Sequence, residues 1–438
     1  MKVLLLNDSD NQGGAARGAY RLYQGLQQLG VHANMLVRYQ CTEDPGVFSP
    51  RTLWAKVSRR MGNLPLLRYP DRQVGLFSSQ WFPNGTVRQI RQLQPDILHL
   101  NWICSGYLTV EAIGQLRQPL VWTLRDMWAF TGGCHYSQSC DRYEQTCGHC
   151  PHLGSSVDQD LSRWIWYRKR AAWRDLNLTL VAPSQWMADC AQRSALFHNH
   201  RIEVIHHGLN LQTFHPTQTR IARAALQLPQ DKQIVVFGAP NALEDPRKGF
   251  QYLLPALQQL IANDWGQRIH LVIFGADNPE MSIQLNCPVT SLGHIDSDRT
   301  LALLYAAADV MIVPSLQEAF GHTACEAIAC GTPVVGFNAT GIKDIVAHQQ
   351  SGYLARAYEI DDLARGIAWV LQDPERHAHL RRTARSQAVA NFDYVKQATY
   401  YTRLFEDLLE QEPALSPQRV PLSQKMSDLL PSVSRWKD

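Results

Sequence analysis

Short apolar runs alternate with longer stretches of helical periodicity along most of the 438 residues. Runs of this length are typical of buried strands in a parallel sheet, and the stretches between them predict crossover helices. In the first half, the expected strands lie at residues 2–6, 33–37, 97–100, 120–124, 178–182 and 203–206. In the second half, they lie at residues 233–238, 270–275, 289–293, 310–314 and 334–337. The pattern predicts an α/β protein with parallel sheets.

The break between the two series predicts two domains. The segment GLNLQTFHP, residues 208–216, has the Gly, Asn and Pro content of a linker. We expect Rossmann-like domains at residues 1–210 and 211–392, each with its own core. Residues 393–412 continue a helical pattern, whereas the four prolines and many serines of residues 413–438 predict a flexible tail.

Composition excludes several classes of protein. Hydrophobic residues make up 45% and charged residues 18%, which is typical of an ordinary globular chain. A net charge of +3 is too small to indicate nucleic acid as a partner. The N-terminal apolar run is too short for a signal peptide or a membrane span, which predicts a cytoplasmic protein. Its ten cysteines are then expected to begin as thiols.

One stretch nevertheless has the composition of a membrane-facing surface. Residues 51–91 hold eight Arg or Lys against one acid, Asp71, and these charges are mixed with Trp, Phe and Leu residues. This composition is consistent with peripheral contact with an anionic lipid surface. A solvated basic face is the alternative interpretation.

The strongest candidate for a functional site is VPSLQEAFGHTACEAIACGTPVV, residues 313–335. It predicts a strand, a loop with Glu318, a short helix with Glu326 and a second strand. Ligands of α/β proteins bind at the carboxyl edge of the sheet, and a helix N-terminus favours phosphate. Phosphate-binding N–H groups beside two carboxylates suit a nucleotide-sugar, whose hydroxyls donate hydrogen bonds.

Two other turns fit the same ligand. The segment GGAAR, which starts at Gly13 and Gly14, follows the first strand, and its small residues allow close approach of a ligand. It is not a dinucleotide fingerprint, and a simple tight turn is the alternative. In the second half, Arg247 and Lys248 precede Gly249 at a strand-to-helix loop. They can neutralise a diphosphate, or they are an ordinary solvated pair.

Together, the GGA turn, the RKG loop and EAFGHTACE resemble glycosyltransferase family 4, whose members have the GT-B fold and retain anomeric configuration. IEVIHHGLNLQTFHP resembles the inter-domain segment of that family. The segment from WTLRDMW to CPHLG is similar to a subgroup of bacterial exopolysaccharide and lipopolysaccharide glycosyltransferases. The resemblance implies two Rossmann-like domains that face each other across a cleft, and a C-terminal helix that crosses back to the first domain.

The resemblance also implies an activity. The chain is expected to be a hexosyltransferase-type enzyme of the EC 2.4 class that uses a UDP-, GDP- or ADP-sugar. The acceptor is expected to be a glycan or a lipid-linked molecule in bacterial surface polysaccharide synthesis, and no cofactor is required for catalysis. The alternatives are a GT-B-type nucleotide-sugar epimerase and a catalytically degenerate nucleotide-sugar-binding subunit.

The family's site residues map onto this sequence as follows. Glu326 is expected to bind the ribose, Glu318 the donor sugar, and Arg247 with Lys248 the diphosphate. The donor-binding residues that the resemblance implies are Gly13, Gly14, Phe320, Gly321, His322, Thr323 and Glu326. For catalysis the resemblance implies Glu318, Arg247 and Lys248, and Arg125 and Asp126 are further candidates from the sequence itself.

Two positions depart from the family pattern. Ala239 and Pro240 stand where the family has an Arg, so Arg247 is expected to replace it. Arg125 stands where the family often has His. An arginine can stabilise negative charge but does not shuttle protons near neutral pH. Asp126 is expected to pair with Arg125 or to bind the acceptor, and His99 is another candidate for the missing histidine.

Two further motifs involve metal-binding residue types. Asp8-Ser9-Asp10 and Asp296-Ser297-Asp298 resemble the Asp-x-Asp of metal-dependent glycosyltransferases, but turn-prone Asp is favoured for backbone capping alone, and we interpret neither as a metal site.

The other motif is a cysteine cluster, C-x5-C-x6-C-x2-C, with two interleaved histidines. Cys134, Cys140, Cys147 and Cys150 can form a tetrahedral structural zinc site. Reduced thiols or a disulfide pair are the alternatives.

Overall fold

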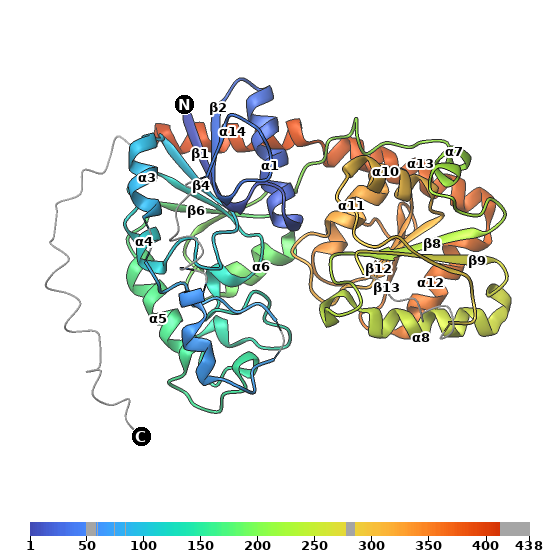
Figure 1. Ribbon diagram of the computed structural model, residues 1–438, viewed down its shortest axis with the longest axis horizontal. Coiled ribbons are helices and arrows are strands. Elements are labelled where there is room, and N and C mark those ends of the chain that lie inside the picture. Colours follow the sequence, from blue (N-terminus) through green and yellow to red (C-terminus); the bar gives the residue numbers. More distant parts are fainter. Residues whose placement is uncertain (50–57, 59, 74, 84, 277–284, 412–438) are drawn as a thin grey trace, which may run out of the picture.

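The computed structural model describes residues 1–49, 58, 60–73, 75–83, 85–276 and 285–411. Two α/β units lie side by side (Figure 1). The expected tail at 413–438 and residues 51–57 of the basic stretch lie outside the described residues. Among the described helices, none is both long and apolar enough to cross a bilayer.

The first unit contains a parallel sheet of seven strands in the order β3-β2-β1-β4-β5-β6-β7. The two-residue strand β3 was not predicted because it is too short to produce a periodic pattern. The strands are β1 (Lys2–Ser9), β2 (His32–Tyr39), β3 (Val47–Phe48), β4 (Ile97–Leu100), β5 (Leu120–Thr123), β6 (Leu178–Ala182) and β7 (Arg201–Val204).

Helices cover both faces of this sheet, which explains why its central strands are apolar throughout. One face packs against α1 (Gly13–Gln28) and α14 (Tyr394–Glu410) in a single apolar cluster. The other face packs against α3 (Thr86–Leu93), α4 (Val110–Gly114), α5 (Leu161–Trp173) and α6 (Gln185–Arg193). Short 3-10 turns are η1 (Leu64–Arg68), η2 (Trp128–Phe130), η3 (Arg142–Glu144) and η4 (Pro151–Leu153).

The second unit contains a parallel sheet of six strands in the order β10-β9-β8-β11-β12-β13. The prediction of an α/β fold with parallel sheets is therefore confirmed, although β13 was missed. The strands are β8 (Gln233–Gly238), β9 (Ile269–Phe274), β10 (Val289–Ser291), β11 (Val310–Val313), β12 (Val334–Phe337) and β13 (Gly352–Ala355).

The helices of this unit also form two layers. One face of the sheet packs against α8 (Phe250–Leu260) and α12 (Ile360–Gln372). The other packs against α7 (Thr219–Ala225), α10 (Asp298–Ala307), α11 (His322–Ala329) and α13 (Pro374–Asn391). The remaining short helices are η5 (Pro246–Lys248), η6 (Ile261–Trp265) and η7 (Thr340–Asp344).

The chain crosses between the units twice, and the two crossings are hydrogen-bonded to each other. The N–H of Leu209 donates to the carbonyl of Phe392 at 2.7 Å, and the N–H of Tyr394 donates to the carbonyl of Leu209 at 3.1 Å. A Cβ atom at Gly208 would lie 2.3 Å from the Cα of Tyr394, so this approach requires glycine. Helix α14 begins here and lies along the first unit (Figure 1).

We expect Gly25→Val to destabilise the protein, because Gly25 is the contact point between α1 and α14. A Cβ atom at this position would lie 2.6 Å from the carbonyl oxygen of Tyr394 and 2.9 Å from Cβ of Ala398. Overpacking of this kind typically costs about 1–3 kcal/mol. Thermal unfolding measures the loss, and Gly85→Ala, with open space around the position, is the control. Equal unfolding midpoints for the Gly25 variant and the wild type would contradict the packing of α14 on α1.

Candidate active site between the two units

The candidate site lies where the loops that follow β1, β4 and β5 meet the loops that follow β8 and β11. Parallel strands end at the same edge of a sheet, and ligands bind at that edge. Helix α1 of the first unit and helix α11 of the second begin at these edges and contact each other there. The contacts described next involve side chains from both units.

A buried ion pair joins α1 to α11. Nη2 of Arg21 donates to Oε1 of Glu326 at 3.0 Å, and their side chains are only 5% and 4% exposed. The hydroxyl of Tyr305 donates to Oε2 of Glu326 at 3.1 Å. Burial raises the pKa of Glu326, and Arg21 opposes that shift. The carboxylate expected to bind ribose is therefore already held by two donors, one from each unit.

Arg21 and its neighbour Arg17 also contact the beginning of α10. Arg21 donates to Asp298 at 3.0 Å, and Arg17 donates to Asp298 at 3.4 Å and to the carbonyl of Asp296 at 3.0 Å. The second Asp-Ser-Asp motif is thus engaged by arginines. In the first motif, the carboxylate of Asp10 accepts hydrogen bonds from the backbone of Cys41 and Thr42 at 2.8 Å each.

The side chain of Arg125 is buried next to α1. Its Nη2 donates to Oδ1 of Asn101 at 2.7 Å, and its Nη1 donates to the ring of His207 at 3.0 Å. Burial lowers the pKa of Arg125 to about 10. A Cβ atom on Gly18 of α1 would lie 2.5 Å from Nη1 of Arg125, so α1 can approach the guanidinium only with glycine there.

The N-terminus of α11 is surrounded by positive charge. Gly321 precedes the helix at a φ of +108°, and no described side chain caps the first turn, so its N–H groups remain available to a ligand. The ring of His322 stacks on that of His207 with centroids 5.0 Å apart. Burial lowers the pKa of His322 well below its usual value, and nearby cations lower it further. These cations are Arg21, Arg125, Arg17 and Lys248.

The RKG loop and the EAFG loop are joined by an ion pair. Nζ of Lys248 donates to Oε1 of Glu318 at 2.6 Å. Arg247 instead pairs with Asp245 at 2.5 Å and lies over the ring of Tyr136, 4.3 Å from its centroid. Of the two cations predicted for the diphosphate, Lys248 therefore contacts the site glutamate, and Arg247 spans the gap to the first unit.

Asp126 does not pair with Arg125, which was one of the two roles expected of it. Its carboxylate accepts hydrogen bonds from Nδ1 of His135 at 2.6 Å and from Nε1 of Trp102 at 2.7 Å. Burial acts to raise the pKa of Asp126, but His135 and these hydrogen bonds hold it below its usual range. Hydrogen bonds to Asp126 therefore fix the loop that carries His135, whereas Arg125 is held by Asn101 and His207.

The remaining predicted residues lie at the start of α1, around the start of α11, or on strand β4. Gly13 and Gly14 begin α1, and a Cβ atom on Gly14 would lie 3.2 Å from the His322 ring. Phe320 is buried against the rings of His206, His207, His322 and Phe392, which makes it a packing residue through its side chain. Thr323 occupies the first turn of α11. His99 donates to or accepts from the hydroxyl of Thr123 at 2.8 Å, beneath Tyr401 of α14.

Sequence reasoning missed Arg21, Gly18 and His207. Gly14, Gly18, Arg21 and Gly25 recur at spacings of four, three and four and so share one face of α1. A line of glycines interrupted by one arginine indicates a helix face that is approached closely by another part of the molecule. His207 left no comparable signal, because it lies in an irregular segment.

Comparison with known proteins agrees with this geometry. Two α/β units that meet at the carboxyl ends of their parallel strands define the GT-B class of glycosyltransferase folds. Residues 12–213 match the family described as Glycosyltransferase Family 4, and residues 219–387 match Glycosyl transferases group 1. The chain belongs to this glycosyltransferase family.

Relatives and solved structures span most of the chain. A D-inositol 3-phosphate glycosyltransferase from Streptosporangium roseum is 34% identical over 385 residues, covering 83% of this chain and 82% of that protein. The chain spans about half the length of other curated relatives with that name. Sucrose-phosphate synthase from Thermosynechococcus elongatus shares the fold with a TM-score of 0.65 at 20% identity, over 94% of this chain and 100% of that one. HepE from Anabaena, in complex with UDP and glucose, has a TM-score of 0.63 at 19% identity, over 93% of this chain and 100% of that one.

We expect Arg21→Gln to destabilise the protein by about 3–5 kcal/mol, because it leaves the buried carboxylate of Glu326 without its counter-charge. The double variant Arg21→Gln/Glu326→Gln should recover part of that loss, because no buried charge is then unpaired. Arg17→Gln is the matched control, since its partner Asp298 is 37% exposed and such pairs contribute at most about 1 kcal/mol. Thermal unfolding of the four proteins tests this ranking, and equal losses for the Arg17 and Arg21 variants would contradict it.

Acid should destabilise the protein through His207 and His322. Burial keeps the pKa of both rings well below the value of 6.5 expected in the unfolded chain. Below about pH 6.5 the unfolded chain therefore binds more protons, and stability falls by up to about 1.4 kcal/mol per pH unit for each histidine. His207→Gln should flatten this slope in a series of unfolding midpoints against pH. Replacing the exposed His215 should not, and an unchanged slope in the His207 variant would contradict the interpretation.

Proposed function

We propose that the chain is a retaining glycosyltransferase. It transfers a sugar from a nucleoside diphosphate sugar to a glycan or lipid-linked acceptor, with the donor between the two units. Family membership supports the reaction class. The observation that carries the proposal is the uncapped N-terminus of α11 with its surrounding cations.

The diphosphate is the part of the donor that this region fits best. Backbone N–H groups at a helix N-terminus and nearby cations both favour a phosphate anion. Within the described residues, Nη1 of Arg21 and Nδ1 of His322 are buried without a hydrogen-bond partner. A ligand in this position can satisfy buried groups that otherwise weaken the fold. Lys248 contributes a further cation close to Glu318.

The two carboxylates are then assigned to the hydroxyl groups of the donor. Glu326 binds the ribose and shares its oxygens with Arg21 and Tyr305, whereas Glu318 binds the transferred sugar. HepE was solved with UDP-glucose, which makes a UDP-linked sugar the first donor to test. Polysaccharide synthesis is the process that we assign to the chain, through its resemblance to exopolysaccharide and lipopolysaccharide enzymes.

Catalysis in this proposal rests on charge and position. As the bond from the anomeric carbon to the diphosphate oxygen breaks, negative charge grows on the leaving phosphate, and Lys248, Arg247 and the α11 N-terminus stabilise it. Arg125 adds positive charge but does not act as a base, since its guanidinium keeps its proton near neutral pH. The leaving phosphate accepts the proton of the acceptor hydroxyl on the same face, which retains the configuration.

The acceptor is assigned to the first unit. There the short helix η1 (Leu64–Arg68) carries Leu64 and Leu67 at 42% and 71% exposure. Leu76 nearby in sequence is 60% exposed, and Arg68 and Arg72 lie between these leucines. Exposed leucines among arginines support peripheral contact with an anionic membrane that carries a lipid-linked acceptor.

Glu326→Ala should weaken donor binding about ten- to hundredfold, because it removes the hydrogen bonds that the ribose hydroxyls donate to the charged carboxylate. Lys248→Ala should lower turnover by about 10²–10³-fold, because it removes a group that stabilises the leaving diphosphate. Binding is measured by calorimetry with UDP-, GDP- and ADP-sugars, and turnover by release of the nucleoside diphosphate. Glu375→Ala and Lys396→Ala make the same chemical changes at exposed positions and serve as controls.

The same assays distinguish the alternatives. Conversion of the donor sugar with no acceptor present would indicate an epimerase. Binding without transfer or slow donor hydrolysis across many acceptors would indicate a degenerate subunit. Absence of binding to every nucleotide-sugar, or unchanged behaviour of both site variants, would refute the proposed function.

A further inference from the structure

Residues 131–158 of the first unit form a long irregular loop, all of which the structure describes. Its regular elements are the two short turns η3 and η4. Gln138, Cys147 and His149 all have positive φ values, between 43° and 55°. Loops this long without secondary structure are uncommon in compact domains, and left-handed non-glycine residues are strained. Backbone hydrogen bonds within the loop replace helix or strand ladders; for example, the N–H of His149 donates to the carbonyl of Val157 at 2.9 Å, and the N–H of Cys147 donates to the carbonyl of Arg142 at 3.0 Å.

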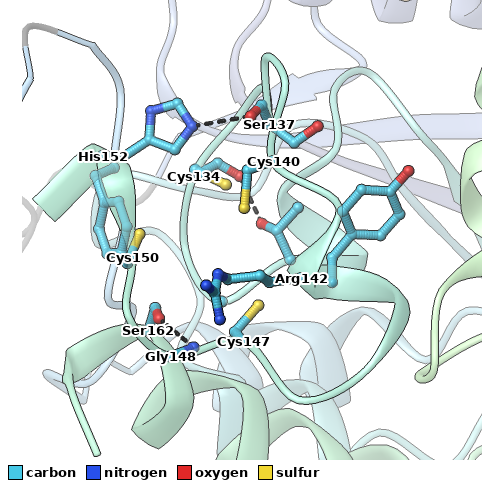
Figure 2. Close-up of a pocket in the computed structure, with 13 residues that line it drawn as sticks. Cys134, Ser137, Cys140, Arg142, Cys147, Gly148, Cys150, His152 and Ser162 are labelled. Atoms are coloured by element: carbon cyan, nitrogen blue, oxygen red, sulfur yellow. Dashed lines mark hydrogen bonds between the residues drawn. The ribbon is translucent and has the colours of Figure 1, made fainter. Parts of the chain in front are cut away.

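Four cysteines of this loop line one small pocket (Figure 2). Cys134 and Cys150 are buried, and Cys140 and Cys147 are partly buried. The cavity volume is about 20 Å³, measured as the space that the centre of a water-sized sphere can reach. This is enough for roughly one such sphere. The four cysteine side chains therefore share one pocket.

Burial raises the pKa of all four thiols, and backbone hydrogen bonds act in the opposite direction at three of them. Cys147 accepts a hydrogen bond from the backbone of Gly132, and Cys140 accepts one from the backbone of Arg142. Cys150 accepts hydrogen bonds from the backbone of Leu153 and His152. Hydrogen bonds of this kind favour the charged form of the acceptor, and such second contacts orient the ligands of metal sites.

Two cations lie near the pocket, and neither forms an ion pair with a carboxylate among the described residues. Lys169 is fully buried, and its ammonium donates to the carbonyls of Trp128 and Thr131 and lies over the Trp128 ring. Burial lowers the pKa of Lys169 to about 7, and the nearby Cys104, Cys147 and Cys134 oppose that shift when they are ionised. Arg142 lines the pocket as a second cation. A zinc ion with four thiolates carries a charge of −2, which these two cations can offset.

The neighbouring histidines are already engaged. Nδ1 of His135 bonds Asp126 at 2.6 Å, and its Nε2 bonds Ser78 at 2.9 Å. Nδ1 of His149 bonds the carbonyl of Ser156 at 2.7 Å. Nε2 of His152 bonds the carbonyl of Ser137 at 3.2 Å. The four sulfurs are therefore the ligand set that the pocket offers.

We propose that Cys134, Cys140, Cys147 and Cys150 bind one structural zinc ion as four thiolates. On binding, the four thiols lose their protons to solvent and form four Zn–S bonds, with no change in oxidation state. In the described residues no three His, Cys, Asp or Glu side chains already stand close enough to hold a metal. Zinc must therefore draw the sulfurs inward by side-chain rotation.

The metal stabilises a loop that contacts the second unit. The backbone N–H of Gln138 donates to Gln317 at 2.9 Å, and Gln317 donates back to the carbonyl of Gln138 at 3.0 Å. Tyr136 supports the guanidinium of Arg247. Zinc thus positions one side of the cleft without touching the reacting atoms.

The test is the metal content of the full chain, purified without chelators. We expect about one zinc per chain by mass spectrometry, and a tetrahedral thiolate spectrum after replacement with Co²⁺. Cys147→Ser and Cys150→Ser should each lose most of the zinc, while the control Cys41→Ser, an exposed cysteine outside the loop, should keep it. Chelation of the wild type should lower its unfolding midpoint.

The wild-type measurements decide the matter even where a variant fails to fold. Wild-type protein without zinc would overturn the proposal, whether thiol titration finds the four cysteines reduced or paired in disulfides. Zinc retained by both loop variants would overturn it as well, because the metal would then be bound elsewhere. Metal content is independent of whether the chain transfers a sugar.

Discussion

The buried ion pair between Arg21 and Glu326 is the interaction on which the relation of the two units depends. Removing two charges from water is costly, and their attraction compensates only when the geometry is good and the remaining atoms are hydrogen-bonded. Tyr305 and Asp298 supply those further bonds. The pair brings α1 against α11, and Gly14 and Gly18 allow that approach because a side chain there would meet His322 or Arg125.

This arrangement concentrates positive charge where no fixed anion balances all of it. Glu326, Glu318 and Asp298 pair with Arg21, Lys248 and Arg17, while Arg125 is held by the neutral partners Asn101 and His207. The uncapped α11 N-terminus adds the partial charge of the helix dipole. In the proposed function, a diphosphate supplies the missing negative charge, and the same groups stabilise it as it departs. Binding and catalysis would then draw on one electrostatic arrangement.

Local pattern was enough to predict the two parallel-sheet units, and it also selected the candidate donor site, whose role stays a prediction. Glu318 and Glu326 lie in one continuous motif, so spacing alone brought them to the same sheet edge. The contacts of Arg21 could not be predicted, because its partner Glu326 is 305 residues away and only the tertiary fold brings them together. Asp126 was expected beside Arg125 because the two are adjacent in sequence. The two residues lie in a bend after β5, where the structure turns Asp126 toward His135 and Arg125 toward Asn101. The strand β3 was missed because two residues carry no periodicity, and β13 was missed because its sequence, GYLA, begins with glycine and has no β-branched residue.

The position of the phosphates in a crystal structure with bound UDP tests the central claim most directly. We expect phosphate oxygens within hydrogen-bonding distance of the N–H groups that begin α11 and of Nζ of Lys248, and we expect the ribose at Glu326. Phosphates bound elsewhere, or a diphosphate that leaves the α11 N-terminus and Lys248 without contact, would contradict it.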